Sequence, residues 1–249
     1  PCLNPSLVYN SIMNKLYLII VMAALYLVLT GGMSLAKDSD ADEIQVAKDD
    51  NYYYMKDVEK AKEAIRTNPD DAIAYCNLGY AYHSLGKYKK AIEACRQAIK
   101  IDPNDSYSYQ IIGNAYRLSG RNKEAVKEYI HSIKIDPDNS FPHYWLGLAY
   151  SNLSMYKKAV ESYKQAVRIA PANGYQDSLG MAYSNLGMYK EAVEAFKQAV
   201  RRFPDAENHF NLGSAYHFLN DRSSSLEQYK ILKSIDAEKA NELFNLIYK

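Results

Sequence analysis

The sequence predicts an all-α fold in which antiparallel helix pairs stack in a row. Residues 146–171 and 179–204 are identical at 19 of 26 aligned positions, with the second stretch starting 33 residues after the first. A Leu-Gly or Ile-Gly pair recurs along the chain at spacings of 34, 34, 33 and 33 residues, starting at Leu78, Ile112, Leu146, Leu179 and Leu212. A period of this length is typical of an array of stacked repeats.

Each unit of the array is predicted to contain two helices. A tyrosine follows every glycine of the pairs by three residues, so the Leu and Tyr side chains are at i and i+4 on one face of a first helix. The second helix carries a small residue at Ala91, Ala125, Ala159 and Ala192. We expect these small residues to lie opposite the glycine and to let the two helices approach closely.

Glycine and proline predict where the helices end. Gly86, Gly120 and Gly187 are placed to end a first helix in the left-handed conformation, whereas Ser154 and Asn220 replace the glycine in two units. The second helices are expected to stop before the prolines at positions 103, 137, 171 and 204, because proline disfavours a helical residue before it.

The pattern divides the repeat region, residues 52–249, into seven parts. They are a half-repeat (52–71), five repeats (72–105, 106–139, 140–172, 173–205 and 206–236) and a capping helix (237–249). The capping helix places Ala240, Leu243, Phe244 and Ile247 on one apolar face, and the whole region is predicted to hold about 12 helices.

The residues before the repeats have a different character. Residues 1–12 precede the first methionine and are interpreted as an upstream extension. Residues 13–36 resemble a signal peptide, with Lys15, an apolar run over 16–29 and a predicted cleavage after Ala36. The alternative is an uncleaved anchor over 16–36, which would also be the only contact with a membrane. Residues 37–51 are predicted to be an acidic linker or a frayed lead-in to the repeats.

Charge and motif content argue against several classes of function. The net charge is +1, and Lys15 is the only charged residue among the first 36, so the rest of the chain is neutral overall. Nucleic acid is therefore not expected as a partner. The three cysteines form no CxxC pair, and the five histidines form no HExxH motif. We predict no metal, no cofactor, no catalytic residue and no enzymatic activity.

The repeated pattern resembles the tetratricopeptide repeat: Leu-Gly-x-x-Tyr, then Gly-x-Tyr-x-x-Ala, an aromatic residue, and finally Ala and Pro. Asn122, Arg222 and Ala237 depart from it locally. The resemblance implies a right-handed superhelical solenoid of antiparallel helix pairs. It also implies that the first helices line a concave face, which commonly binds a protein or an extended peptide.

Carried over residue by residue, the resemblance assigns a set of partner-binding positions to the concave face. They are Tyr80, His83, Tyr107, Gln110, Asn114, Arg117, Phe141, Tyr144, Trp145, Leu148, Asn152, Met181, Asn185, Phe210, Asn211 and His217. Cys76, Asn77, Asp177, Ser184 and Ser214 fall on the same face.

Two features of this set shape the functional prediction. Arg117 is its only basic residue, so the family's clamp for a C-terminal carboxylate is not expected. Phe141, Tyr144 and Trp145 form an aromatic patch suited to anchoring a partner, and packing between repeats is the alternative role for Tyr144 and Trp145. The sequence thus predicts an exported scaffold, periplasmic or secreted, that binds other proteins. The alternative is an assembly factor anchored in the inner membrane, with the solenoid outside the cytosol.

Overall fold

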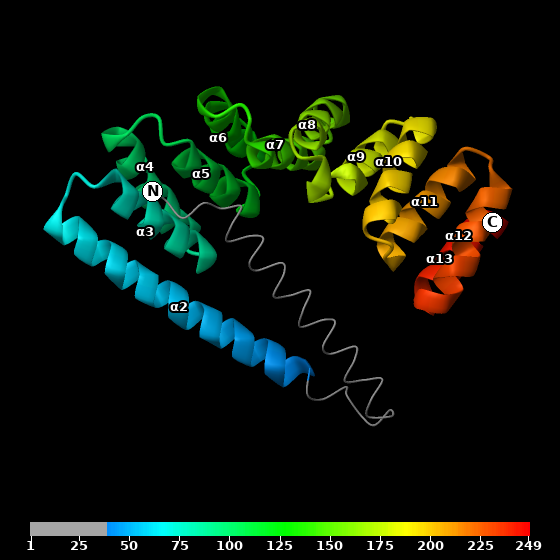
Figure 1. Ribbon diagram of the computed structural model, residues 1–249, viewed down its shortest axis with the longest axis horizontal. Helices are drawn as coiled ribbons and strands as arrows, with labels where there is room; N and C mark the ends of the chain where they lie inside the picture. The colour runs from blue at the N-terminus through cyan, green and yellow to red at the C-terminus, as the bar shows by residue number, and fades with distance from the viewer. Residues whose placement is uncertain (1–38) are drawn as a thin grey trace. The chain divides into compact units, whose positions relative to one another are not determined.

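The chain is helical throughout the part that the structure describes. The computed structural model describes the backbone of residues 39–249 and the side chains of residues 51–249. These residues form twelve α-helices and one short 3-10 helix, and they contain no strand, which confirms the predicted all-α fold class (Figure 1). The predicted extension (1–12) and the predicted signal peptide or anchor (13–36) lie outside the described residues.

The helices belong to two compact units, which comprise 39–104 and 105–249 of the described residues. Unit one contains α2 (Ser39–Thr67), α3 (Ala72–Ser84) and α4 (Tyr88–Ile101). Unit two contains α5 (Ser106–Leu118), α6 (Asn122–Ile135), α7 (Ser140–Asn152), α8 (Tyr156–Ile169), the 3-10 helix η1 (Pro171–Asn173), α9 (Gln176–Asn185), α10 (Tyr189–Arg202), α11 (Ala206–Phe218), α12 (Arg222–Ile235) and α13 (Ala237–Tyr248).

The start of α2 corrects one prediction. Residues 37–51 were expected to be an acidic linker or a frayed lead-in, and α2 begins at Ser39 and continues through them to Thr67, which contradicts the linker alternative. The linker was predicted from polar composition alone, yet residues 39–51 contain neither glycine nor proline to interrupt a helix that continues on their C-terminal side. No helix among the described residues has a stretch long and apolar enough to cross a membrane.

The ends of the helices follow the sequence signals. The second helices α4, α6, α8 and α10 each stop one residue before an X-Pro pair, as predicted. Four of the five first helices begin at a side-chain cap, and α9 is the exception. For example, Asp71 accepts a hydrogen bond from the Ala74 amide, and Asp105 accepts hydrogen bonds from the Tyr107 and Ser108 amides. These caps satisfy amides that lack a partner within the helix.

Every turn between the two helices of a pair contains a residue with positive φ, whether or not that residue is glycine. Gly86, Gly120 and Gly187 have φ of 69°, 76° and 72°, and Ser154 and Asn220 adopt the same region with φ of 56° and 63°. The two replacements therefore keep the turn geometry, although serine and asparagine incur a steric cost that glycine avoids.

The packing of first helix on second helix corrects the predicted role of the alanines. A side chain added at Gly113 would meet the ring of Tyr129, and one added at Gly180 would meet the ring of Phe196, at 2.6 and 2.7 Å respectively. The side chain nearest the glycine is thus a large ring in these pairs, rather than the expected alanine. Alanines such as Ala125 are completely buried beside this contact.

Unit one uses a smaller residue at the equivalent contact. The space above Gly79 is filled by the sulfur of Cys95, which is completely buried, as is Cys76. A thiol can take the place of the ring because it is a small apolar group that fills the same gap.

The core of unit two runs through successive repeats. Its central cluster joins Tyr163 of α8, Leu179 and Tyr183 of α9, Phe196 of α10 and Leu212 of α11. Since each helix pair packs on its neighbours, the apolar face of one repeat is covered only when the next repeat is present.

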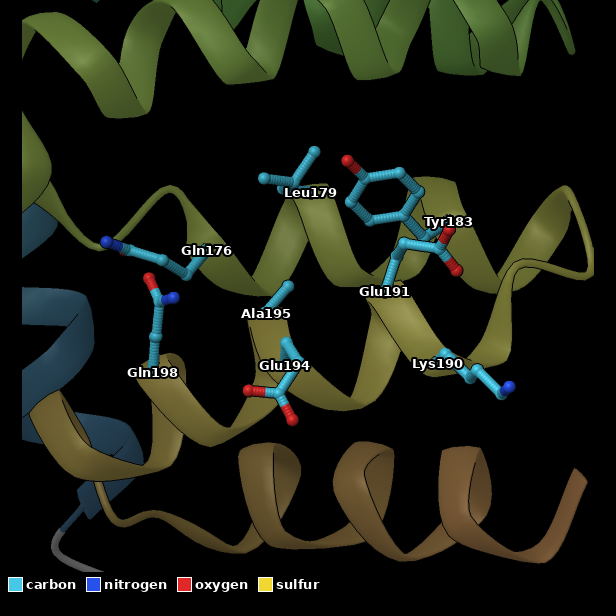
Figure 2. A pocket seen from close by; sticks show the side chains of 8 residues that line it. All are labelled: Gln176, Leu179, Tyr183, Lys190, Glu191, Glu194, Ala195 and Gln198. Carbon is cyan, nitrogen blue, oxygen red and sulfur yellow. The ribbon is translucent and has the colours of Figure 1, made fainter. Parts of the chain in front are cut away.

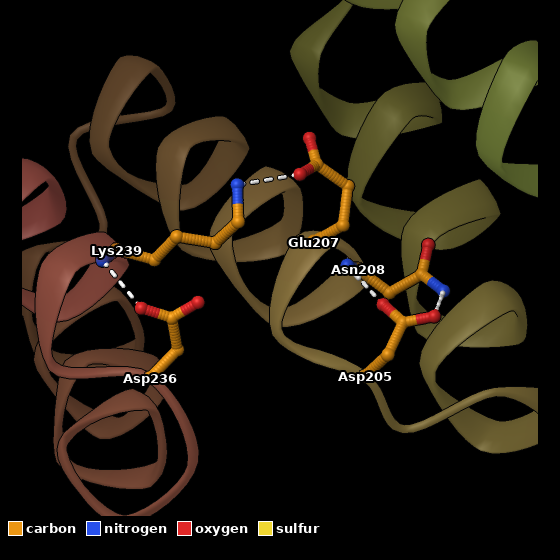
Figure 3. A network of polar contacts seen from close by, with 5 residues as sticks. All are labelled: Asp205, Glu207, Asn208, Asp236 and Lys239. Carbon is orange, nitrogen blue, oxygen red and sulfur yellow. Dashed lines mark hydrogen bonds and ion pairs between the residues drawn. The ribbon is translucent and has the colours of Figure 1, made fainter. Parts of the chain in front are cut away.

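Helix α13 covers the end of the array. It buries Ala240, Leu243 and Ile247, as predicted, whereas Phe244 is 39% exposed and lies at the edge of the apolar face. Figure 3 shows polar contacts of the capping helix α13. The Lys239 ammonium group pairs with Glu207 of α11 at 2.5 Å, and the Asp236 carboxylate caps α13. The pair is exposed and contributes little stability by itself, so the buried apolar face holds the capping helix in place.

Candidate functional site

The first helices carry most of the predicted binding residues. On α5, Gln110, Asn114 and Arg117 are at i, i+4 and i+7 and lie on one side of the helix. In unit two, α5 contacts α7, and α9 contacts α11. We call the side of α5, α7, α9 and α11 that carries the predicted residues the first-helix surface.

The predicted residues of unit one have aromatic neighbours within their own unit. The ring of Tyr80 is 6.3 Å from that of Tyr54, and the ring of His83 is 5.8 Å from that of Tyr88. Cys76 is completely buried, so it is not available to a partner in this structure.

Some predicted residues of α5 lie below the surface. Gln110 is only 2% exposed, and Asn114 is 9% exposed and accepts a hydrogen bond from the Tyr129 hydroxyl at 2.8 Å. Tyr107, at the start of the helix, is half-buried. Gln110 was predicted to face a partner, but neighbouring helices cover it, so its side chain serves packing.

The aromatic patch divides into two parts, and the first part belongs to the core between repeats. The ring of Trp145 is 5.7 Å from Phe141 and 6.1 Å from Tyr129, and it packs against the buried cluster that contains Ala125 and Tyr129 of α6. This placement favours the packing role for Trp145.

The second part of the patch is centred on Tyr144. Its ring stacks on Tyr175 with centroids 4.6 Å apart, and it lies 5.8 Å from Tyr163. Burial raises the pKa of the Tyr144 hydroxyl, and burial also raises the pKa of Tyr163 to about 12. Both hydroxyls are therefore neutral at physiological pH and can donate hydrogen bonds.

The middle of the first-helix surface is the part most open to solvent. Met181 is 51% exposed, Leu148 is half-buried, and Asn152 and Asn185 are both exposed. An exposed methionine can adapt its shape to an apolar group.

The last repeat contributes a smaller mixed patch. Phe210, Asn211 and His217 are half-buried. The Lys239 ammonium group lies 5.4 Å from the centre of the Phe210 ring, and the His217 ring meets Phe218 edge to face at 5.3 Å. The capping helix therefore adds a cation to this end of the surface.

Two opposite charges flank Tyr144. Arg117, at the end of α5, is half-buried, and its Nε atom is buried without a hydrogen-bond partner. Asp177, on α9, is also half-buried, and burial raises the pKa of its carboxyl group. Neither side chain forms an ion pair with another described residue.

Two buried hydroxyl groups beneath this surface, those of Tyr129 and Tyr163, were not foreseen as part of the site. The Tyr129 hydroxyl reaches Asn114 from α6, and the Tyr163 hydroxyl reaches Ser151 from α8 at 3.3 Å. The repeat pattern has an aromatic residue at this position of the second helix, and the buried rings of Tyr129 and Tyr163 pack there. In the fourth repeat the residue at this position is Phe196, which has no hydroxyl group. The tyrosines of the second and third repeats differ from it by that polar group, and this difference is the sequence signal for a polar role.

A shallow pocket of about 360 Å³ lies outside the predicted set, between α9 and α10. Figure 2 shows its lining by Gln176, Leu179, Tyr183, Lys190, Glu191, Glu194, Ala195 and Gln198. A similar pocket of about 340 Å³ occurs between α3 and α4. Its lining residues occupy equivalent repeat positions, so the pocket is a consequence of helix-pair packing. Among the described residues, no group of three or more His, Cys, Asp or Glu side chains could hold a metal ion.

Comparison with protein families gives a consistent result. Models described as "Tetratricopeptide repeat" match residues 72–105 and 141–173, residues 175–206, and residues 94–127. A further model described as "TPR repeat" matches residues 52–86 and 113–154. Together they cover 52–173 and 175–206, which is more than half of the chain. A comparison with curated protein sequences finds no match.

Solved structures of helical-repeat proteins resemble this chain. YrrB, described as a TPR protein with an unusual peptide-binding site, is 25% identical with a TM-score of 0.64 over 75% of this chain and 93% of its own. MamA from Desulfovibrio magneticus RS-1 is 22% identical with a TM-score of 0.62, over 67% and 96%. A thermophilic TPR protein from Thermus thermophilus is 23% identical with a TM-score of 0.52, over 65% and 90%. These likenesses confirm the predicted solenoid of antiparallel helix pairs.

Proposed function

The chain belongs to the tetratricopeptide repeat family, and from this membership we propose that it binds an extended segment of a partner protein on the first-helix surface of unit two. Proteins of this family generally bind proteins or peptides. YrrB, which aligns with most of this chain, is one that has a peptide-binding site. The chain is therefore an interaction scaffold, and the use of its concave face for an extended peptide is the proposed part.

One observation carries the proposal. The first-helix surface offers an adaptable side chain, Met181 of α9, which is 51% exposed, and the half-buried aromatic ring of Tyr144 of α7. The charged groups of Arg117 and Asp177 lie on the same surface without ion-pair partners among the described residues. Aromatic and charged groups that converge on one surface are typical of the centre of a protein interface.

Site-specific photo-cross-linking tests which surface meets the partner. A photoreactive phenylalanine analogue at position 181 is expected to cross-link to partner proteins in an extract of the source cells. The same analogue at Met188, which is 38% exposed in the turn before α10, is the matched control. We expect covalent products from position 181, identified by mass spectrometry, and few or none from position 188.

The control also defines the contrary result. If the same partners cross-link equally from positions 181 and 188, or from position 188 alone, the partner does not bind on the first-helix surface. Circular dichroism of both labelled proteins shows whether the helices are retained, and we expect retention because both positions are exposed.

Export of the protein is part of the same proposal. The charged residue Lys15, the apolar run over 16–29 and the small residues up to Ala36 support a signal peptide that is cleaved after Ala36. The partner would then be another protein outside the cytosol. Retention of residues 16–36 would instead make the protein a membrane-anchored assembly factor that uses the same solenoid.

The N-terminal sequence and the intact mass of the native protein separate these two outcomes. We expect Lys37 as the first residue of the mature chain, recovered from the soluble envelope fraction. A mass that includes residues 13–36, together with recovery in the membrane fraction, would support the anchored form instead.

A further inference from the structure

Two residues near Tyr144, Arg117 and Asp177, carry opposite charges that the repeat pattern does not require. At the repeat position of Arg117 the next two repeats have Ser151 and Ser184, and at the position of Asp177 the preceding repeats have Gln110 and Tyr144. One cation and one anion therefore occur singly, on α5 and α9, with α7 between them in the chain.

Contacts between repeats bring both charges to the same aromatic cluster. The Tyr129 hydroxyl bonds to Asn114, one turn before Arg117, so the Arg117 side chain starts beside that hydroxyl. On the other side, the Tyr175 ring stacks on Tyr144 at 4.6 Å, two residues before Asp177.

The electrostatics of the cluster agree with this placement. The pKa of Tyr144 is raised mainly by burial, and the Asp177 charge raises it further while the Arg117 charge lowers it. The same two charges act in the same opposite directions on the pKa of Tyr163, which burial raises to about 12. Tyr144 and Tyr163 thus lie within range of both charges.

Both charges have hydrogen-bond contacts within the chain, Arg117 with the Tyr129 side chain and Asp177 with Ser178, but neither has a counter-ion among the described residues. A partly desolvated ion that lacks a counter-ion costs free energy, which a ligand of opposite charge would recover. The chain itself supplies no ion pair to either group within its described part. In addition, the nearby Asp205 charge helps to raise the pKa of Asp177, so the field around Asp177 favours a cation.

We propose that the first-helix surface of unit two selects a peptide segment that carries both signs of charge, with an acidic side chain contacting Arg117 and a basic side chain contacting Asp177. The aromatic group of Tyr144 would lie under the residues between them. This proposal rests on the proposed function, because it specifies the chemistry of the segment bound at the same surface.

The fold sets the approximate spacing of the two charges on the peptide. Packed helices are about 8–10 Å apart. Arg117 and Asp177 lie on first helices two repeats apart, and the long Arg117 side chain shortens the gap between the two charges. A separation on the order of 10–15 Å corresponds to roughly three to five residues of an extended chain.

A peptide array tests the proposal with a defined probe. Twelve-residue peptides of Ala, Ser and Tyr carry one Glu and one Lys, separated by one to eight residues and in both orders. Control peptides carry two Glu, two Lys or no charge. We expect the wild-type protein to bind the Glu/Lys peptides of intermediate spacing about tenfold better than any control peptide, as charge-assisted hydrogen bonds would produce.

Single substitutions assign each charge to its partner. Arg117→Gln is expected to abolish the preference for Glu while keeping that for Lys, and Asp177→Asn is expected to do the reverse. Arg121→Gln is the matched control, because Arg121 is exposed and already paired with Glu124 at 2.8 Å. An Arg117→Glu/Asp177→Lys double variant is expected to prefer the opposite order of Glu and Lys.

Two results would overturn the proposal: binding that does not depend on peptide charge, including no binding at all, or identical preferences in the wild type and both single variants. Cross-linking from position 181 is independent of these outcomes. If it succeeds while the array shows no charge preference, the first-helix surface still binds a partner, and only the proposed preference for a peptide with both charges is wrong. If position 181 also fails to cross-link, the proposed function itself is wrong.

Discussion

Replacing Phe196 with alanine is expected to lower the free energy of unfolding by about 3–5 kcal/mol, which is the usual cost of removing a fully buried aromatic side chain. The ring is 2% exposed in the central cluster of unit two and lies across Gly180 of α9. Its loss leaves a cavity at the contact between the two helices of the fourth repeat. Urea denaturation followed by circular dichroism measures the change.

The matched control is Phe218→Ala. Phe218 is 49% exposed, and its ring contacts are those with Tyr189 at 5.1 Å and His217 at 5.3 Å, so we expect a loss of at most about 1 kcal/mol. Because repeats are stabilised by their neighbours, amide hydrogen exchange in Phe196→Ala should increase most in α9, α10 and α11. Equal losses in both variants, or uniform exchange along unit two, would contradict this account of the core.

Periodicity explains why most of the fold could be predicted from the sequence. The recurrence of Leu-Gly and Tyr places Leu179 and Tyr183 on one face of the same helix, and the structure buries both. The X-Pro pairs marked the ends of the second helices because proline acts through local sterics. Signals of this kind need no knowledge of neighbouring elements.

Features that depend on context could not be predicted in the same way. The extension of α2 to Ser39 follows a polar stretch with no periodic apolar pattern, so composition alone suggested a linker. Similarly, the repeat pattern shows that an aromatic residue and a glycine occur in each unit. It does not show that the ring of Tyr163, rather than Ala159, lies over Gly147.

For the candidate site, the sequence predicts on which side of a helix a residue lies but not how deeply the residue is buried. Repeat register places Gln110 and Met181 on the same side of their helices, yet Gln110 is 2% exposed and Met181 is 51% exposed. Burial depends on the side chains of adjacent repeats, which differ even though the positions are equivalent. Likewise, the sequence does not show that the charges of Arg117 and Asp177 both act on Tyr144, because contacts between repeats bring them near it.

Gly147→Ala is expected to destabilise the protein by about 1–3 kcal/mol, the range for overpacking a tight core. Gly147 lies within α7, where replacing glycine by alanine would otherwise stabilise the helix by about 1 kcal/mol. Here the added carbon would be 2.5 Å from Cε1 of Tyr163, so the ring must move. The sign of the change, measured by urea denaturation, therefore distinguishes steric contact from helix propensity.

A second substitution shows whether the ring is the cause. Tyr163→Leu shortens the side chain over Gly147, and it is expected to destabilise the wild type because the Tyr163 ring is 1% exposed. In that background, however, Gly147→Ala should become close to neutral or stabilising, since the space for its methyl group then exists. The coupling in this double-mutant cycle should exceed about 0.5 kcal/mol. Additive effects would mean that contact with the ring does not explain the glycine, and that Gly147 is required for another property of the backbone.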